Sequence, residues 1–199
     1  MNEIGNKLLV SPSILWESTI DEIFKKNSQH FLPGPWQIFL LGDGSPTRHL
    51  HLLTGKEVSV QLIAMESELT SCSSAPKEIE KLKKPLLRRQ VWLECGSITL
   101  AWAESWWNLV QAERHLQDKN QPIWKSLTKD RSELFRQVDG LNLVEAKWLN
   151  KRFENEGPYW SRYYRFFRNQ QELTVIREVF NPKIEDWLGP TIKKPLIDK

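Results

Sequence analysis

The sequence has little cysteine and no long apolar run. Its thiols are Cys72 and Cys95 among 199 residues, too few for a disulfide framework, and too few for a zinc site without further ligands. No run of about 18 consecutive apolar residues occurs, so we expect no segment that spans a membrane. Residues Met1 to Val10 carry Glu3 and lack an apolar stretch, which argues against a secretory signal. These features predict a reduced, soluble, cytoplasmic protein.

An excess of one charge is also lacking. The chain has 28 Lys and Arg residues against 25 Asp and Glu residues, a net charge of +3. This surplus is too small to require a nucleic-acid or membrane partner, although it mildly favours an anionic substrate. The length suits one domain with a real core and is short for two. We therefore expect a single domain over residues 1–199, with residues 1–35 as an N-terminal helical segment.

The common motifs of cofactor and metal chemistry are missing. The sequence contains no G-x-S-x-G elbow, Walker loop or G-x-G-x-x-G, and Gly42-Asp43-Gly44 lacks the third glycine of a dinucleotide loop. The four histidines do not stand at metal-ligand spacing, and we expect them at the surface: His30, His49, His51 and His115. We predict no cofactor and no metal.

The hydrophobic periodicity changes along the chain. The spacing of apolar residues predicts helices over 11–26 and 106–117. Residues 122–140 are expected to form a short helix and a loop. Residues 71–85 are expected to form a long loop or short helix. Alternation predicts strands over 56–64, 88–94, 97–104, 159–167 and 173–180, with hairpin turns at Cys95-Gly96 and at 168–171. The pattern predicts an α+β fold with antiparallel strands.

Aromatic residues are abundant, with ten tryptophans. Packing in the core and its rim is the first interpretation, and a surface for an aromatic ligand is the second. Residues 159–168 mix basic and aromatic side chains, as single-strand nucleic-acid binders do. On a strand, however, Arg162 and Arg168 share one face and Arg165 lies on the other, so no single basic stripe forms. We expect no nucleic-acid partner.

Two charged residues share strand faces with apolar ones. Arg89 alternates in phase with Val91 and Leu93, and Glu178 alternates with its apolar neighbours two positions away. A lone inward charge is costly unless it is paired or meets a polar ligand. The pattern therefore leaves two interpretations open. One is a buried ion pair between Arg89 and Glu178, or pairing of each with other groups, and the other is a ligand site.

Three separated segments resemble the chorismate pyruvate-lyase family. They are Leu40-Leu41-Gly42-Asp43-Gly44-Ser45-Pro46-Thr47-Arg48 with the following Gly55-Lys56-Glu57-Val58-Ser59-Val60, then Arg89-Gln90-Val91-Trp92-Leu93, and finally Arg177-Glu178-Val179-Phe180-Asn181-Pro182. Their order and spacing over residues 40–182 match the family. The resemblance implies an antiparallel sheet of about six strands, with helical flaps from 36–53 and 106–127 over an enclosed site.

The resemblance also implies a function and its residues. The function is elimination of pyruvate from chorismate to give 4-hydroxybenzoate for quinone biosynthesis, without a cofactor. Arg89 corresponds to the arginine that binds the substrate carboxylate, and Glu178 to the essential glutamate, which either transfers a proton or positions the substrate. Ile123 stands at the position whose backbone amide contacts the ligand in the family. Pro46 stands at the position of a methionine in the site of a relative.

Two other functions remain open from the sequence. One is a non-catalytic protein that binds an aromatic acid on the same fold. The other is a tryptophan-rich module that contacts a protein or pigment partner and would expose apolar patches. The sequence does not indicate an oligomeric state.

Overall fold

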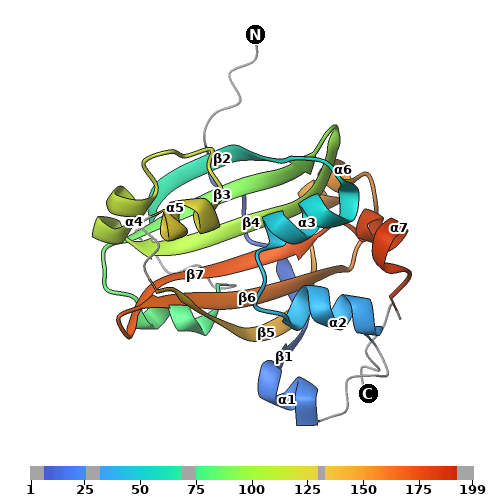
Figure 1. Ribbon diagram of the computed structural model, residues 1–199, viewed down its shortest axis with the longest axis horizontal. Helices are drawn as coiled ribbons and strands as arrows, with labels where there is room; N and C mark the ends of the chain where they lie inside the picture. The colour runs from blue at the N-terminus through green and yellow to red at the C-terminus, as the bar shows by residue number, and fades with distance from the viewer. Residues whose placement is uncertain (1–6, 26–31, 69–74, 130–132, 192–199) are drawn as a thin grey trace.

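The computed structural model describes residues 7–25, 32–68, 75–129 and 133–191. These residues form one open antiparallel sheet with helices, which confirms the predicted α+β fold (Figure 1). The seven strands are β1 (Ser13–Thr19), β2 (Val58–Glu68), β3 (Leu86–Cys95), β4 (Ile98–Asn108), β5 (Phe135–Glu145), β6 (Tyr159–Arg168) and β7 (Gln171–Phe180). Their order across the sheet is β1-β5-β6-β7-β4-β3-β2.

Both predicted hairpins form. β3 and β4 are joined at Gly96, whose φ of +63° is readily adopted by glycine. β6 and β7 are joined through Asn169 and Gln170, with φ values of +49° and +62°. Two central residues with positive φ are typical of the tight turn whose twist matches that of the strands. Together the two hairpins place β3, β4, β6 and β7 in the middle of the sheet.

The helices lie on both faces of the sheet. They are α1 (Ile20–Lys25), α2 (Gly34–Leu41), α3 (Pro46–Thr54), α4 (Leu109–His115), α5 (Ile123–Thr128), α6 (Lys147–Phe153) and α7 (Glu185–Leu188), with 3-10 turns η2 (Lys77–Lys81) and η3 (Pro182–Ile184). Apolar residues of α2 to α5 pack on one face, which we call the helical face. In Figure 1, α2, α3 and α5 are seen in front of the strands. Apolar residues of η2 and α6 pack on the opposite face.

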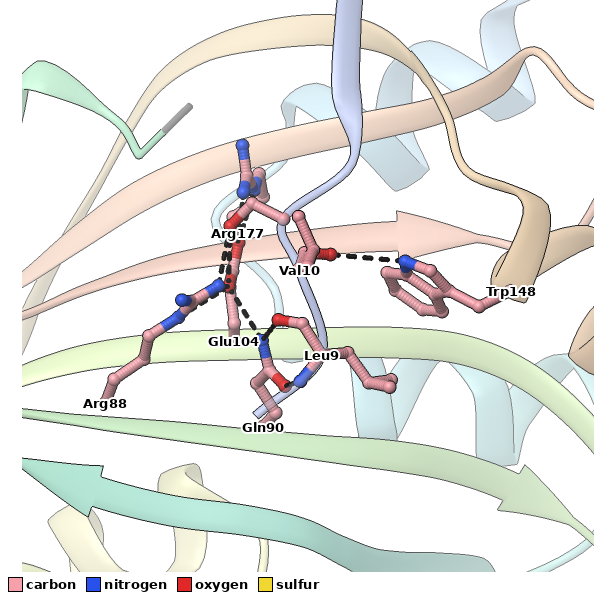
Figure 2. A network of polar contacts seen from close by, with 8 residues as sticks. Leu9, Val10, Arg88, Gln90, Glu104, Trp148 and Arg177 are labelled. Carbon is pink, nitrogen blue, oxygen red and sulfur yellow. Dashed lines mark hydrogen bonds and ion pairs between the residues drawn. The ribbon is translucent and has the colours of Figure 1, made fainter. Parts of the chain in front are cut away.

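The opposite face carries a buried polar network (Figure 2). The Glu104 carboxylate accepts hydrogen bonds from Arg88 Nε at 3.0 Å and from Arg177 Nε at 2.7 Å. Gln90 donates to the same carboxylate and exchanges two hydrogen bonds with the backbone of Leu9. Chain segment 7–12 is thereby held over the central strands. All three charged residues of this network have hydrogen-bond partners within it, as buried charges require.

The prediction of a helix over residues 11–26 is wrong in part. The same holds for the prediction that residues 1–35 form a helical segment. Residues 13–19 form β1, which pairs with β5 from Ser13↔Glu145 to Thr19↔Gly140, and only 20–25 are helical there. The apolar residues of this short segment suit either period, so the partner strand decides. β5 itself, predicted as helix and loop, supplies that partner. Residues 26–31 lie outside the described part of the chain.

The predicted helix from residue 106 begins later. Trp106 and Trp107 continue β4, and both side chains are fully buried on opposite faces of the sheet. Consecutive buried aromatic residues are accommodated in a central strand because each face has its own core. Packing is also the main role of the tryptophans, since four are fully buried and only Trp124 and Trp187 rank among the exposed large hydrophobic residues. This distribution does not favour a tryptophan-rich interaction surface.

Candidate functional site

The helical face has a small, partly open cavity of about 40 Å³ between α3, α5 and the central strands. Its floor is formed by apolar side chains of β2, β3 and β4, including Val60, Val91 and Ala103. All four residues singled out from the sequence line this one cavity: Pro46, Arg89, Ile123 and Glu178.

Arg89 lies on β3 and is 2% exposed. Its Nη2 donates to the Lys119 carbonyl at 2.7 Å and to the Gln121 carbonyl at 3.4 Å, whereas its Nε has no hydrogen-bond partner. Burial lowers the pKa of Arg89 to about 10, and the charge of Asp118 partly opposes this shift. The guanidinium remains charged at neutral pH, yet within the described ranges no carboxylate forms an ion pair with it. Such a buried cation favours an anionic ligand.

Glu178 lies on β7 and has two buried partners from β6. Arg162 Nε donates to Oε2 at 2.8 Å, and the Tyr164 hydroxyl donates to Oε1 at 2.8 Å. Burial and the Glu178 charge raise the pKa of Tyr164, so its hydroxyl stays protonated. Of the two interpretations left open from the sequence, an Arg89–Glu178 ion pair is wrong. Glu178 pairs instead with Arg162.

A second unpaired guanidinium, that of Arg136 on β5, also lines the cavity. Its Nη1 donates to the carbonyls of Asp43 and Gly44, while its Nε has no partner. Burial lowers its pKa. Sequence reasoning missed Arg136 because residues 122–140 were predicted as helix and loop. The useful signal was its two-residue spacing from Val138, which places both on one face of a strand.

The arginines of β6 follow the predicted alternation. Arg162 points to the helical face, where Nη1 donates to the carbonyls of Phe39 at 3.0 Å and Gly42 at 3.1 Å. Arg165 forms ion pairs with Asp139 and Glu172. The segment 39–44, which comprises the end of α2 and the turn before α3, is therefore held by hydrogen bonds from the buried guanidinium groups of Arg162 and Arg136. These bonds fix the turn that leads to Ser45 and Pro46, which line the cavity.

The two flaps implied by the resemblance are present as helices. Residues 34–54 form α2 and α3, and residues 109–128 hold α4 and α5, so the second flap starts after the predicted Trp106. Pro46 is the first residue of α3 and Ile123 the first residue of α5. Proline has no backbone N–H, whereas the N–H of Ile123, at the first position of α5, makes no hydrogen bond within its own helix. It can therefore donate to another group.

The histidines differ in burial, which corrects the expectation that all lie at the surface. His115 is buried, His49 is half-buried and His51 is exposed, while His30 lies outside the described ranges. Burial and the nearby Arg162 and Arg136 charges lower the pKa of His49. In the part of the chain that the structure describes, no three His, Cys, Asp or Glu residues stand close enough to hold a metal ion. No helix there is long and apolar enough to cross a membrane.

The fold and the cavity together define an α+β protein with a partly open pocket that two buried arginines line. The fold is shared with the effector domain of PhnF from Mycobacterium smegmatis, at a TM-score of 0.50 and 10% identity, over 70% of this chain and 90% of that one. Full-length PhnF gives a TM-score of 0.51 and 11% identity, over 72% of this chain and 66% of that one.

Residues 40–188 match the family Chorismate pyruvate-lyase Rv2949c-like, and the chain belongs to this family. It is 33% identical over 174 residues to the uncharacterized protein ycf21 of Cyanophora paradoxa, covering 86% of this chain and 90% of the relative. It is 29% identical over 168 residues to the ycf21 protein of Porphyra purpurea, covering 84% and 90%. The matched residues include every residue that lines the cavity, the second flap, and the first flap from residue 40 onward.

Proposed function

We propose that this chain is a cofactor-independent lyase that eliminates pyruvate from chorismate and leaves 4-hydroxybenzoate, an aromatic acid that quinone biosynthesis consumes. One observation carries the proposal. The buried Arg89 guanidinium has no carboxylate partner within the described residues and lines the same cavity as Glu178. Membership of the family supports the same substrate.

Arg89 holds the ring carboxylate. A guanidinium can donate two parallel hydrogen bonds to a carboxylate, which fixes both the position and the plane of the ligand. The apolar floor of Val91, Leu93 and Ala103 then receives the ring. The backbone N–H of Ile123 and the ring of Pro46 contact the ligand from the flaps. Binding the anion offsets the cost of leaving the Arg89 charge buried without a partner.

Glu178 positions the ring hydroxyl at the other end. Both of its oxygens already accept hydrogen bonds, from Arg162 and from Tyr164. A carboxylate held in this way is well placed to accept one more hydrogen bond from a substrate hydroxyl. The two hydrogen bonds fix the orientation of the carboxylate, which suits a group that holds the substrate hydroxyl in place. We therefore assign Glu178 a positioning role.

The reaction needs little chemical help from side chains. The ether C–O bond breaks, the neighbouring ring carbon loses its hydrogen as a proton, and the ring becomes aromatic. The enolpyruvyl group takes up a proton and leaves as pyruvate. Orientation of the ether and exclusion of water are contributions that an enclosed cavity can make.

Incubation of the purified chain with chorismate, in the presence of EDTA, tests the proposal. We expect pyruvate and 4-hydroxybenzoate in equal amounts, at a rate that survives chelation and dialysis. E178Q keeps the shape and one acceptor oxygen, so a positioning role predicts a slower enzyme with an unchanged pH profile. Absence of both products would refute the lyase function, and recovery of activity by an added divalent ion would refute its cofactor independence.

A second candidate is a protein that binds an aromatic acid without converting it. It is favoured by the fold shared with the effector domain of PhnF. The same incubation separates the two functions. A binder would take up 4-hydroxybenzoate, as seen by calorimetry, and leave chorismate intact.

A further inference from the structure

The substrate of the proposed reaction carries two carboxylates, and its aromatic product carries one. Arg89 is assigned to the ring carboxylate and Glu178 to the ring hydroxyl, so the carboxylate of the enolpyruvyl group still has no partner. The ether carbon is next to the carbon that bears the hydroxyl. The second carboxylate must therefore lie at the Glu178 end of the cavity. An ionised carboxylate enters an enclosed site at high cost unless a cation receives it.

Arg136 is a buried cation at that end. It is 8% exposed and lines the cavity together with Glu178. The charges that act on Arg136 include those of Glu178 and Arg162, whereas the charge that acts on Arg89 is that of Asp118. The two guanidinium groups thus have different electrostatic neighbours, which places Arg136 with the Glu178 cluster and Arg89 away from it.

The hydrogen bonds of Arg136 leave part of its donor capacity unused. Nη1 donates to two backbone carbonyls of the segment 39–44, and Nε is buried without a partner among the described residues. Among the described residues, no hydrogen bond or ion pair joins Arg136 to Glu178, whose carboxylate binds Arg162 and Tyr164. The rings of Tyr164 and Phe166, each with its centroid 4.6 Å from the guanidinium carbon, hold the group in place.

The charge balance of the site matches a dianion. Arg89 and Arg136 line the cavity with one carboxylate, that of Glu178, which Arg162 already neutralises, so two positive charges remain inside it. The carboxylates of Asp118 and Asp43 also act on the two arginines, but both residues are exposed to solvent. A monoanion such as 4-hydroxybenzoate would compensate one of the two positive charges. A substrate with two carboxylates would compensate both.

We propose that Arg136 binds the second carboxylate of the substrate and makes this site selective for a two-carboxylate ligand over the one-carboxylate product. The inference rests on the proposed function, because it assigns a role within the same site. After the ether bond breaks, the second carboxylate leaves with pyruvate. The aromatic product then keeps its contacts with Arg89 and Glu178 and loses the contact with Arg136, which favours its replacement by new substrate.

A purely structural role for Arg136 makes a different prediction. If the residue serves only to hold the segment 39–44 through the Asp43 and Gly44 carbonyls, its loss should weaken every ligand alike. If it binds the second carboxylate, its loss should weaken two-carboxylate ligands selectively.

The test compares two stable probes by isothermal titration calorimetry. One is 3-(carboxymethoxy)-4-hydroxybenzoate, which carries both carboxylates and the hydroxyl, and the other is 4-hydroxybenzoate. We expect R136Q to bind the first probe at least about tenfold more weakly and the second within about threefold of the unaltered chain. R89K, the matched control, should weaken both probes to a similar extent. R136K, which keeps the charge but loses the planar two-pronged geometry, takes the place of R136Q if the glutamine variant fails to fold.

An equal loss for both probes, or no loss for either, would overturn the inference. The chorismate assay distinguishes failure of this inference from failure of the proposed lyase function. If the unaltered chain releases pyruvate and R136Q has the same KM for chorismate, the lyase function is supported and the role of Arg136 is contradicted. If the chain binds the two-carboxylate probe selectively but releases no pyruvate, the role of Arg136 is supported and the lyase function is contradicted.

Discussion

Arg162 and Glu178 are direct cross-strand neighbours in the β6–β7 pair, with Nε of one 2.8 Å from Oε2 of the other. Their side chains are 0% and 3% exposed. The negative charge of the inward Glu178 carboxylate is thus compensated by Arg162 within the sheet. Arg89, two strands away from β7 across β4, lacks such a balance. This difference separates a structural ion pair from a ligand-binding cation on the same face.

Removal of one member of the Arg162–Glu178 pair should destabilise the fold strongly. E178Q leaves the Arg162 charge buried, and R162M leaves the Glu178 charge buried, so each should lower the free energy of unfolding by about 3–5 kcal/mol. The double variant should recover part of the loss, with a coupling energy of roughly 1–3 kcal/mol. Urea unfolding of the four proteins measures this coupling.

The control cycle uses Arg89 and Glu178. Because these residues form no ion pair, their unfolding free energies should add within about 0.5 kcal/mol. Strong coupling in this cycle, with full activity in R89K, would contradict the assignment of the site.

Arg88 and Arg89 are adjacent in β3 and offer a matched pair of substitutions. R89K keeps the charge but loses the two-pronged geometry, so we expect a loss of about 1.5–3 kcal/mol in 4-hydroxybenzoate binding and little change in Tm. R88K alters the Glu104 network on the opposite face, so it should lower Tm and leave ligand affinity unchanged. Calorimetry and thermal unfolding distinguish the two outcomes. Loss of affinity in R88K and not in R89K would reverse the assignment of the two faces.

The product should stabilise the fold, because it binds the enclosed cavity of the folded chain only. At about 100 times its Kd, 4-hydroxybenzoate should add roughly 2.7 kcal/mol to the free energy of unfolding. Thermal unfolding with and without the acid measures this gain, and benzoate, which lacks the hydroxyl for Glu178, is the control ligand. No shift with millimolar 4-hydroxybenzoate, together with a clear shift for an unrelated acid, would count against this class of ligand.

His49 should make stability depend on pH near neutrality. Its pKa is lowered in the folded state, chiefly by burial, so the unfolded chain binds more protons as pH falls through the ordinary histidine range. The free energy of unfolding should therefore decrease on acidification from about pH 7.5 to about pH 5.5. H49Q should reduce this decrease, whereas H51Q, an exposed change in the same helix, is the control. Equal slopes for H49Q and the unaltered chain would show that His49 does not contribute.

Periodicity located much of the sheet. The alternation of charged and apolar residues placed Arg89 and Glu178 on inward faces, and the structure brings both to one cavity with Pro46 and Ile123. The hairpin turns were also predictable, because their positions follow from turn residues between alternating runs. The strands β1 and β5 were not, since short mixed segments carry no clear period and pair only once the sheet has formed.

The sequence by itself determined the α+β class, the two central hairpins and the face on which each charged strand residue lies, because side-chain direction in a strand alternates with period two. Only the tertiary structure decided which charges meet. Strand order and register set Arg162 opposite Glu178, brought β5 and Arg136 beside them, and left Arg89 without a counter-charge among the described residues. Such pairings depend on distances between segments far apart in the chain, which no local pattern records.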